Sequence, residues 1–116
     1  MRDDNIVVIK SKAFAIPVIN LYKFLMQEKK EFVLSKQILK SGTSIGANVR
    51  EAVRAQSRAD FISKIGIAFK ESDETCYWLE LLHETDFIGD TEFNSVYADA
   101  DELVKLLAAI LKSSKQ

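Results

Sequence analysis

The 116-residue sequence is poor in residues that interrupt regular structure and in residues that build reactive or metal-binding sites. It contains one cysteine, one histidine, one proline and four glycines. A single cysteine excludes an intrachain disulfide, and we expect a reducing, cytoplasmic setting. A lone histidine argues against a zinc cluster. Because a many-stranded fold needs many turns and turn-forming residues are few, long helices are favoured.

Long hydrophobic runs are absent near the start of the chain. The first apolar run, residues 6–9, has four residues, too few for a secretory signal or a membrane span. The apolar fraction of 47% and the charged fraction of 28% are those of an ordinary globular protein. The length predicts one domain over residues 1–116, with no membrane association.

The formal net charge of −1 hides a marked asymmetry along the chain. Residues 1–58 carry 11 Lys/Arg against 5 Asp/Glu, a net +6. Residues 59–116 carry 5 Lys/Arg against 12 Asp/Glu, a net −7. Either the two halves neutralise each other within the fold, or different surfaces meet different partners, including the opposite face of another subunit.

Helical periodicity dominates the rest of the chain. Because the connections between the segments are short, neighbouring helices are expected to be antiparallel, and the fold class predicted is all-α, an up-down four-helix bundle. The four predicted helices are Ser11–Lys30, Ser35–Gln56, Arg58–Phe87 and Thr91–Lys112.

The first predicted helix contains the only proline of the sequence. Pro17 removes one backbone hydrogen bond and clashes with the preceding turn, which predicts a kink or a later helix start. Residues 6–9 are expected as an extended lead-in. At the other end of the chain, Gly89 suits a helix C-terminus and Asp90 or Thr91 suits the next N-cap.

The segment SGTSIGANVREA, residues 41–52, has two glycines and three hydroxyl side chains. A phosphate-binding P-loop needs Lys and then Ser or Thr after its last glycine, whereas Ala47 and Asn48 follow Gly46. A dinucleotide-binding fingerprint needs a third glycine and a preceding strand, and both are missing. We therefore interpret the segment as helix, with Gly42 and Gly46 allowing another helix to approach closely.

One face of this second helix is predicted to be the core stripe, and beside it runs a small polar flank that is expected to form hydrogen bonds between helices. The stripe consists of Ile38, Gly42, Ile45, Val49, Val53 and Gln56, and the flank of Ser41, Ser44 and Asn48.

The opposite face of the same helix is basic. A continuous helix would make a strip about 33 Å long, suited to following a nucleic-acid backbone. The alternatives are a solvated helix face or a salt-bridge partner for the acidic third helix. No aromatic residue interrupts the strip, so base stacking is not supported. This basic strip consists of Lys36, Lys40, Arg50, Arg54 and Arg58.

The third helix has two apolar faces, of which a monomer needs only one. A Trp-centred second patch of Ile67, Trp78 and Leu81 predicts a contact between subunits, and the alternative is that the N-terminal lead-in covers it. The other face is the predicted core, made of Phe61, Ile65, Ala68, Phe69, Ser72, Cys76, Leu79, Leu82 and His83.

Catalytic constellations are not apparent. Glu80 and His83 form a Glu-x-x-His pair of the kind used by di-iron bundles, but those sites need the pair twice and this chain has one histidine. Cys76 and His83 lie about 10.5 Å apart along a helix, too far for a nucleophile and its base. We expect no enzyme activity, no metal and no cofactor.

The run from Ser41 to Leu82 resembles the four-helix-bundle proteins encoded in intervening sequences of bacterial 23S ribosomal RNA genes. The resemblance continues through SRADF, KES, ET and YWLE, and the first helix also looks like the family's apart from Pro17. The shared core motif and the residues around it are Ser41, Gly42, Ser44, Ile45, Gly46, Asn48 and Glu51.

The resemblance implies a bacterial protein of unknown function that forms a ring-like homo-oligomer, a pentamer. It also implies kinship with pentameric accessory proteins of diversity-generating retroelements, which bind nucleic acid and are strongly basic, whereas this chain is slightly acidic. The leading hypothesis is a non-enzymatic oligomer that binds ribosomal or other structured RNA through the basic strip. The alternative is a protein–protein adaptor or scaffold ring with no role in nucleic-acid binding.

Overall fold

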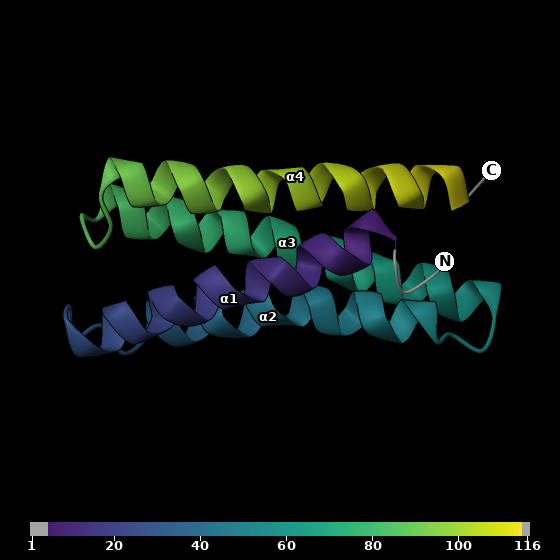
Figure 1. Ribbon diagram of the computed structural model, residues 1–116, viewed down its shortest axis with the longest axis horizontal. Coiled ribbons are helices and arrows are strands. Elements are labelled where there is room, and N and C mark those ends of the chain that lie inside the picture. Colours follow the sequence, from purple (N-terminus) through teal and green to yellow (C-terminus); the bar gives the residue numbers. More distant parts are fainter. Residues whose placement is uncertain (1–4, 115–116) are drawn as a thin grey trace.

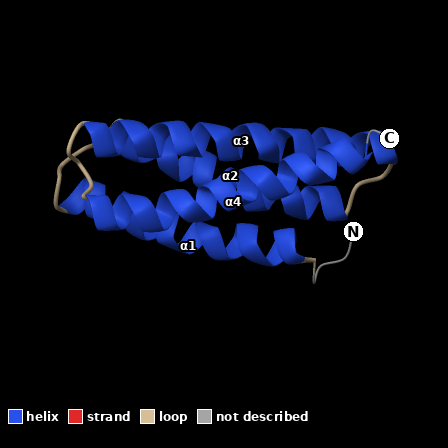
Figure 2. Cartoon of the chain, turned by 90° about the horizontal axis from the view of Figure 1, so that it is seen from above, coloured by secondary structure: helices blue, strands red, loops and turns tan. Residues whose placement is uncertain are grey.

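In the part of the chain that the structure describes, four α-helices are connected by short loops (Figures 1 and 2). The computed structural model describes residues 5–114, and no strand occurs in that range. This confirms the predicted all-α class and the number of helices. Their bounds are α1 (Ile6–Gln27), α2 (Leu34–Val53), α3 (Arg58–Glu84) and α4 (Asp90–Ser114).

The chain reverses direction after each helix, so that consecutive helices lie side by side along the long axis (Figure 1). α2 packs against both α1 and α3, and α4 packs against α3 and, less extensively, against α1. α1 and α3 are therefore on opposite corners of the molecule, a relation on which the placement of the outer surfaces depends.

The start of α1 differs from the sequence expectation. Residues 6–9 are helical rather than extended, because the Asn5 side chain accepts a hydrogen bond from the Val7 backbone N–H at 3.0 Å and caps the helix. Pro17 lies well inside α1, so the prediction of a later start is wrong.

Glu31 caps the start of α2 from outside the helix. Its Oε1 accepts a hydrogen bond from the Ser35 N–H at 2.7 Å, and its Oε2 accepts from Val33 and Leu34, each at 3.1 Å. A carboxylate at this position satisfies N–H groups that have no partner within the helix and complements the helix dipole. Glu31 therefore fixes where the α1–α2 loop ends.

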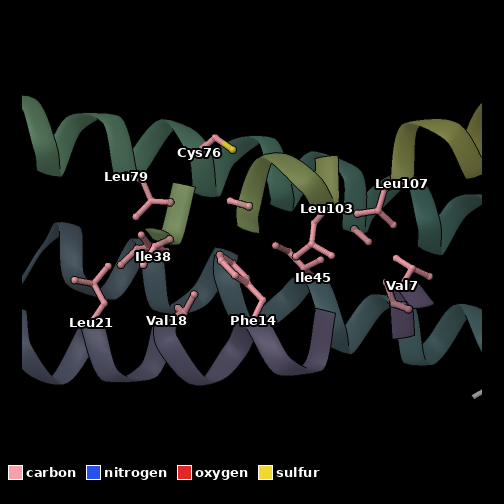
Figure 3. Packing of buried hydrophobic residues seen from close by; sticks show 14 of the residues in the cluster. Val7, Phe14, Val18, Leu21, Ile38, Ile45, Cys76, Leu79, Leu103 and Leu107 are labelled. Atoms are coloured by element: carbon pink, nitrogen blue, oxygen red, sulfur yellow. The ribbon is translucent and has the colours of Figure 1, made fainter. Parts of the chain in front are cut away.

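All four helices contribute to one hydrophobic core (Figure 3). On α2 the predicted stripe is buried at Ile38, Ile45 and Val49, but Gln56 lies beyond the helix and is exposed. Most of the predicted α3 stripe is buried as well, while Phe61, Phe69 and His83 are half-buried at its edge. The labelled members of the core in Figure 3 include Val7, Phe14, Val18, Leu21, Leu79, Leu103 and Leu107.

The glycines of α2 bring α1 into close contact. A Cβ atom added at Gly42 would lie 2.7 Å from Val18 Cγ1, and one added at Gly46 would lie 3.1 Å from the backbone oxygen of Ser11. The prediction that these glycines admit a neighbouring helix is confirmed. Of the polar flank, only Ser41 bonds across helices, with its Oγ 3.0 Å from Thr75 Oγ1, whereas Ser44 and Asn48 bond within α2.

Two glycine-to-alanine substitutions are predicted to have opposite effects on stability. Gly42→Ala should lower the free energy of unfolding by about 1–3 kcal/mol, because stiff, buried Val18 has to move. Gly66→Ala in α3 should raise it by about 0.5–1 kcal/mol, because its Cβ meets no atom within 4 Å and alanine favours the helix. Urea denaturation of both variants checks this, and equal stabilisation by the two would contradict the close contact.

Candidate nucleic-acid interface

The basic strip is exposed along its whole length, but it is not one continuous helix. Lys36, Lys40 and Arg50 lie on α2, and Arg54 follows its last residue as the C-cap. Arg58 begins α3, and its guanidinium bonds to the backbone carbonyl oxygen of Ser114 at the end of α4. The condition for a full-length strip, one continuous helix, is therefore not met, since α2 ends at Val53 and α3 begins at Arg58.

The C-terminal half of the strip borders a groove between α1 and α2. Arg50 and Arg54 form one wall of this groove of about 410 Å³, and Lys12 from α1 joins them. Lys12 was not part of the sequence prediction, because only the pairing of α1 with α2 brings it beside Arg50. The remaining lining is apolar and consists of Val8, Ile9, Ala13, Ile16 and Val53.

Lys40, in the N-terminal half of the strip, lies near Glu71 of α3. Partial burial raises the pKa of Glu71, the neighbouring carboxylate of Glu74 raises it further, and the ammonium of Lys40 opposes both effects. Lys40 therefore lies close enough to α3 for its charge to be partly offset. At the other end of the strip, Arg50 and Arg54 line one groove together with Lys12.

A salt bridge between Lys64 and Glu51, at 3.1 Å, ties α3 to α2 next to this basic end. The Asp60 carboxylate also accepts a hydrogen bond from the Gln56 backbone N–H at 3.3 Å. Glu51 and Asp60 line a second groove together with Arg50 and Arg54, and each also has a partner at the junction of α2 and α3. The salt bridge between Lys64 and Glu51 runs in the opposite sense to the alternative of a basic strip paired with an acidic third helix, because α3 supplies the cation and α2 the anion.

The outward side of α1 is unexpectedly apolar. Ile9 and Ile16 are 51% and 62% exposed, and Ile6 and Ile19 extend the same surface in both directions. The sequence reading assigned the inward residues of this helix and missed the outward isoleucines. The available signal was composition, since α1 has no acidic residue and only three lysines among its 22 residues.

The predicted subunit contact on α3 is only partly exposed. Ile67 is 39% exposed, whereas Leu81 and Trp78 are half-buried, and Trp78 packs against the core and donates its Nε1–H to Glu74 at 3.2 Å. The N-terminal lead-in does not cover this face, because residues 6–9 belong to α1 on the opposite corner. Tyr77, whose ring lies beside that of Trp78, is 52% exposed.

The Glu80 and His83 pair does not converge on a common site. The Tyr97 hydroxyl donates to Glu80 at 2.8 Å, while His83 Nε2 lies 2.7 Å from Asp90 and its ring stacks on Phe93. Both residues thus connect α3 to α4. Among residues 5–114 no group of three or more histidine, cysteine or acidic side chains is placed to hold a metal.

Cys76 is buried in the core (Figure 3), and burial, together with the nearby carboxylates of Asp101, Asp73 and Glu80, raises the pKa of its thiol to about 11. The thiolate is the nucleophilic form, so Cys76 is unreactive at neutral pH.

Within the described range, none of the helices combines the length and the hydropathy that a membrane crossing requires.

Tyr97 is predicted to remain protonated to unusually high pH. Its hydrogen bond to Glu80, reinforced by burial and by the Glu80 charge, raises its pKa to about 12. Because the folded-state pKa exceeds that of the unfolded chain, this stabilisation is complete below about pH 10 and is lost as pH rises towards 12. Glu80→Ala should return the Tyr97 pKa towards 10.

Absorbance titration at 295 nm measures the pKa of Tyr97. Subtracting the titration of the Tyr97→Phe variant removes the contribution of Tyr22 and Tyr77 and leaves that of Tyr97. An unshifted Tyr97 titration in the wild-type protein would contradict the link between α3 and α4.

Comparison with known proteins adds a relationship to this geometry. The family model described as 23S rRNA-intervening sequence protein matches residues 3–109. A crystal structure of a protein with unknown function from the S23 ribosomal protein family of Bacteroides thetaiotaomicron VPI-5482 is similar at 59% identity and a TM-score of 0.91, covering 92% of this chain and 99% of that chain. No curated protein matches. The activity therefore has to be argued from the surface.

Proposed function

The chain belongs to the family of 23S rRNA-intervening sequence proteins, and we propose that it is a non-enzymatic, homo-oligomeric protein that binds ribosomal or other structured RNA through its basic strip. The observation that carries this proposal is the exposed group of Lys12, Arg50 and Arg54, from two helices, around one groove. Guanidinium and ammonium groups in such an arrangement are suited to phosphates.

Recognition would depend on phosphate position and RNA shape rather than on base edges. Lys36 and Arg54 lie about 27 Å apart at the rise of an α-helix, enough to follow several phosphates of a backbone. Double-stranded RNA is bound mostly through phosphates and 2′-hydroxyls, which suits a strip without stacking aromatics. Each phosphate contact releases counterions, so the affinity should fall steeply with salt.

Assembly would strengthen this binding. We infer an up-down four-helix bundle that joins other copies in a ring-like oligomer, a pentamer by resemblance to the family. Several copies present several strips to one RNA, so contacts that are weak individually combine through effective concentration. The single buried thiol of Cys76 is compatible with the cytoplasmic setting that such a role requires.

The adaptor function is the second candidate, and the exposed isoleucines of α1 favour it. Exposed apolar patches rimmed by polar residues mark protein–protein contacts, whatever the partner. In this alternative the oligomer would hold another protein and the strip would be an ordinary solvated surface. The two functions differ in their response to loss of the arginines.

The test is RNA affinity of the doubly substituted Arg50→Ala/Arg54→Ala protein, measured by fluorescence anisotropy with a labelled stem-loop between about 50 and 200 mM salt. We expect weaker binding to every structured RNA and a salt slope lower by about 2, one for each phosphate contact removed. Lys29→Ala/Lys30→Ala, at exposed lysines in the α1–α2 loop, is the matched control and should retain the wild-type slope.

Light scattering of each variant shows whether assembly is intact. RNA affinity and salt slope that remain at wild-type values in the arginine variant would overturn the RNA-binding proposal. Absence of RNA binding by the wild-type protein at the lowest salt would do the same and favour the adaptor.

A further inference from the structure

The outward surface of α1 combines apolar and positively charged residues. We call it the α1 outer face, and it contains Ile9 and Ile16, which are among the most exposed large apolar side chains, with Lys12 and Lys23 also exposed on the same helix. No carboxylate occurs on α1. A surface of this kind fits an apolar partner surrounded by acidic groups.

The outward surface of α3 has the opposite character. This α3 outer face contains exposed Tyr77, whose ring lies 5.1 Å from that of half-buried Trp78, between the exposed carboxylates of Asp73 and Glu74. Aromatic side chains are enriched at the centres of protein interfaces, and charges at the rim direct association. Ile67 continues the apolar part of this face towards the start of α3.

We propose that the α1 outer face of one copy of this chain docks on the α3 outer face of the next. The charges decide between this contact and a symmetric one. Two α1 outer faces brought together would oppose Lys12 and Lys23 to the same lysines of the other copy, without a carboxylate on either helix. The α3 outer face supplies Asp73 and Glu74 instead.

The position of the two helices makes the contact repeatable. α1 packs on α2 and α4 but not on α3, so that both outer faces of one copy are accessible at once. An interface between two different faces is heterologous, and repetition closes a ring or extends a chain. This inference rests on the self-association part of the proposed function. It names the two surfaces that form the contact between copies, because a contact on α3 alone leaves its partner surface unidentified.

The contact also borders the RNA strip. Arg50 and Arg54 share a groove with Ile9 and Ile16, so that the basic end of the strip lies at the edge of this interface, and Lys36 lies away from it along α2. Assembly and RNA binding therefore have to be measured separately. Treating the protein with nuclease before the measurement removes any association between copies that RNA bridges.

The experiment mixes two variants, each with one face disabled. Ile9→Glu/Ile16→Glu places carboxylates on the α1 outer face, and Tyr77→Glu places another in the acidic α3 outer face. All three positions are more than half exposed, so circular dichroism should show wild-type helicity. Native mass spectrometry should find a wild-type oligomer, a monomer for each variant alone, and a one-to-one dimer in their mixture, joined through the two intact faces.

Val33→Glu is the matched control, since Val33 is 69% exposed in the loop before α2 and belongs to neither face. It should retain the wild-type mass. A monomeric wild-type protein, or a mixture that stays monomeric, would overturn the proposal. Dissociation by the isoleucine variant with wild-type mass for Tyr77→Glu would overturn it as well, because α1 would then contact α1. RNA affinity enters none of these outcomes, so failure here is distinguishable from failure of the strip.

Discussion

The close contact of α1 with α2 at Gly42 and Gly46 is the constraint on which the molecular surface depends. A side chain at either position would meet Val18 or the α1 backbone, so the two helices can pack this closely only because both positions are glycine. This close packing of α1 on α2 buries Val18 and Ser11 and leaves the isoleucines of α1 exposed on the outside. It also places Lys12 beside Arg50, so a packing requirement creates both the apolar face and the basic groove.

Charge separation along the sequence survives in the folded molecule. Lys10 pairs with Glu102 at 2.7 Å across α1 and α4, which neutralises part of the asymmetry. Lys64 pairs with Glu51 across α2 and α3, but this pair does not reduce the asymmetry, because its cation comes from the acidic half and its anion from the basic half. Exposed ion pairs of this kind contribute little to stability. The outer surfaces keep their difference, because α1 has no acidic residue and Asp73 and Glu74 remain exposed on α3. Different faces of one chain thus suit different partners.

The helices were predictable because hydrophobic periodicity and few turn residues are local properties. The helical interpretation of residues 41–52 followed from what comes after Gly46, and the structure confirms it. The start of α1 was not predictable from apolar composition, since it depends on one hydrogen bond from Val7 to Asn5. Likewise the Glu31 cap requires a loop conformation that periodicity does not encode.

The candidate site was only partly predictable, because it depends on how helices pair. The exposed lysines and arginines of α2 could be read from its helical period, but Lys12 reaches them from another helix. Trp78 looked like a freely exposed anchor, yet tertiary packing half-buries it and leaves Tyr77 more exposed. Glu80 and His83 share a metal-site spacing, but α4 supplies each with a separate partner.

Native mass spectrometry of the protein purified without nuclease tests the central claim most directly, because it reports assembly and bound RNA together. The account predicts a whole-number multiple of 13.1 kDa with additional nucleotide mass that high salt removes. A bare monomer, or an oligomer that never carries nucleic acid at low salt, would contradict it.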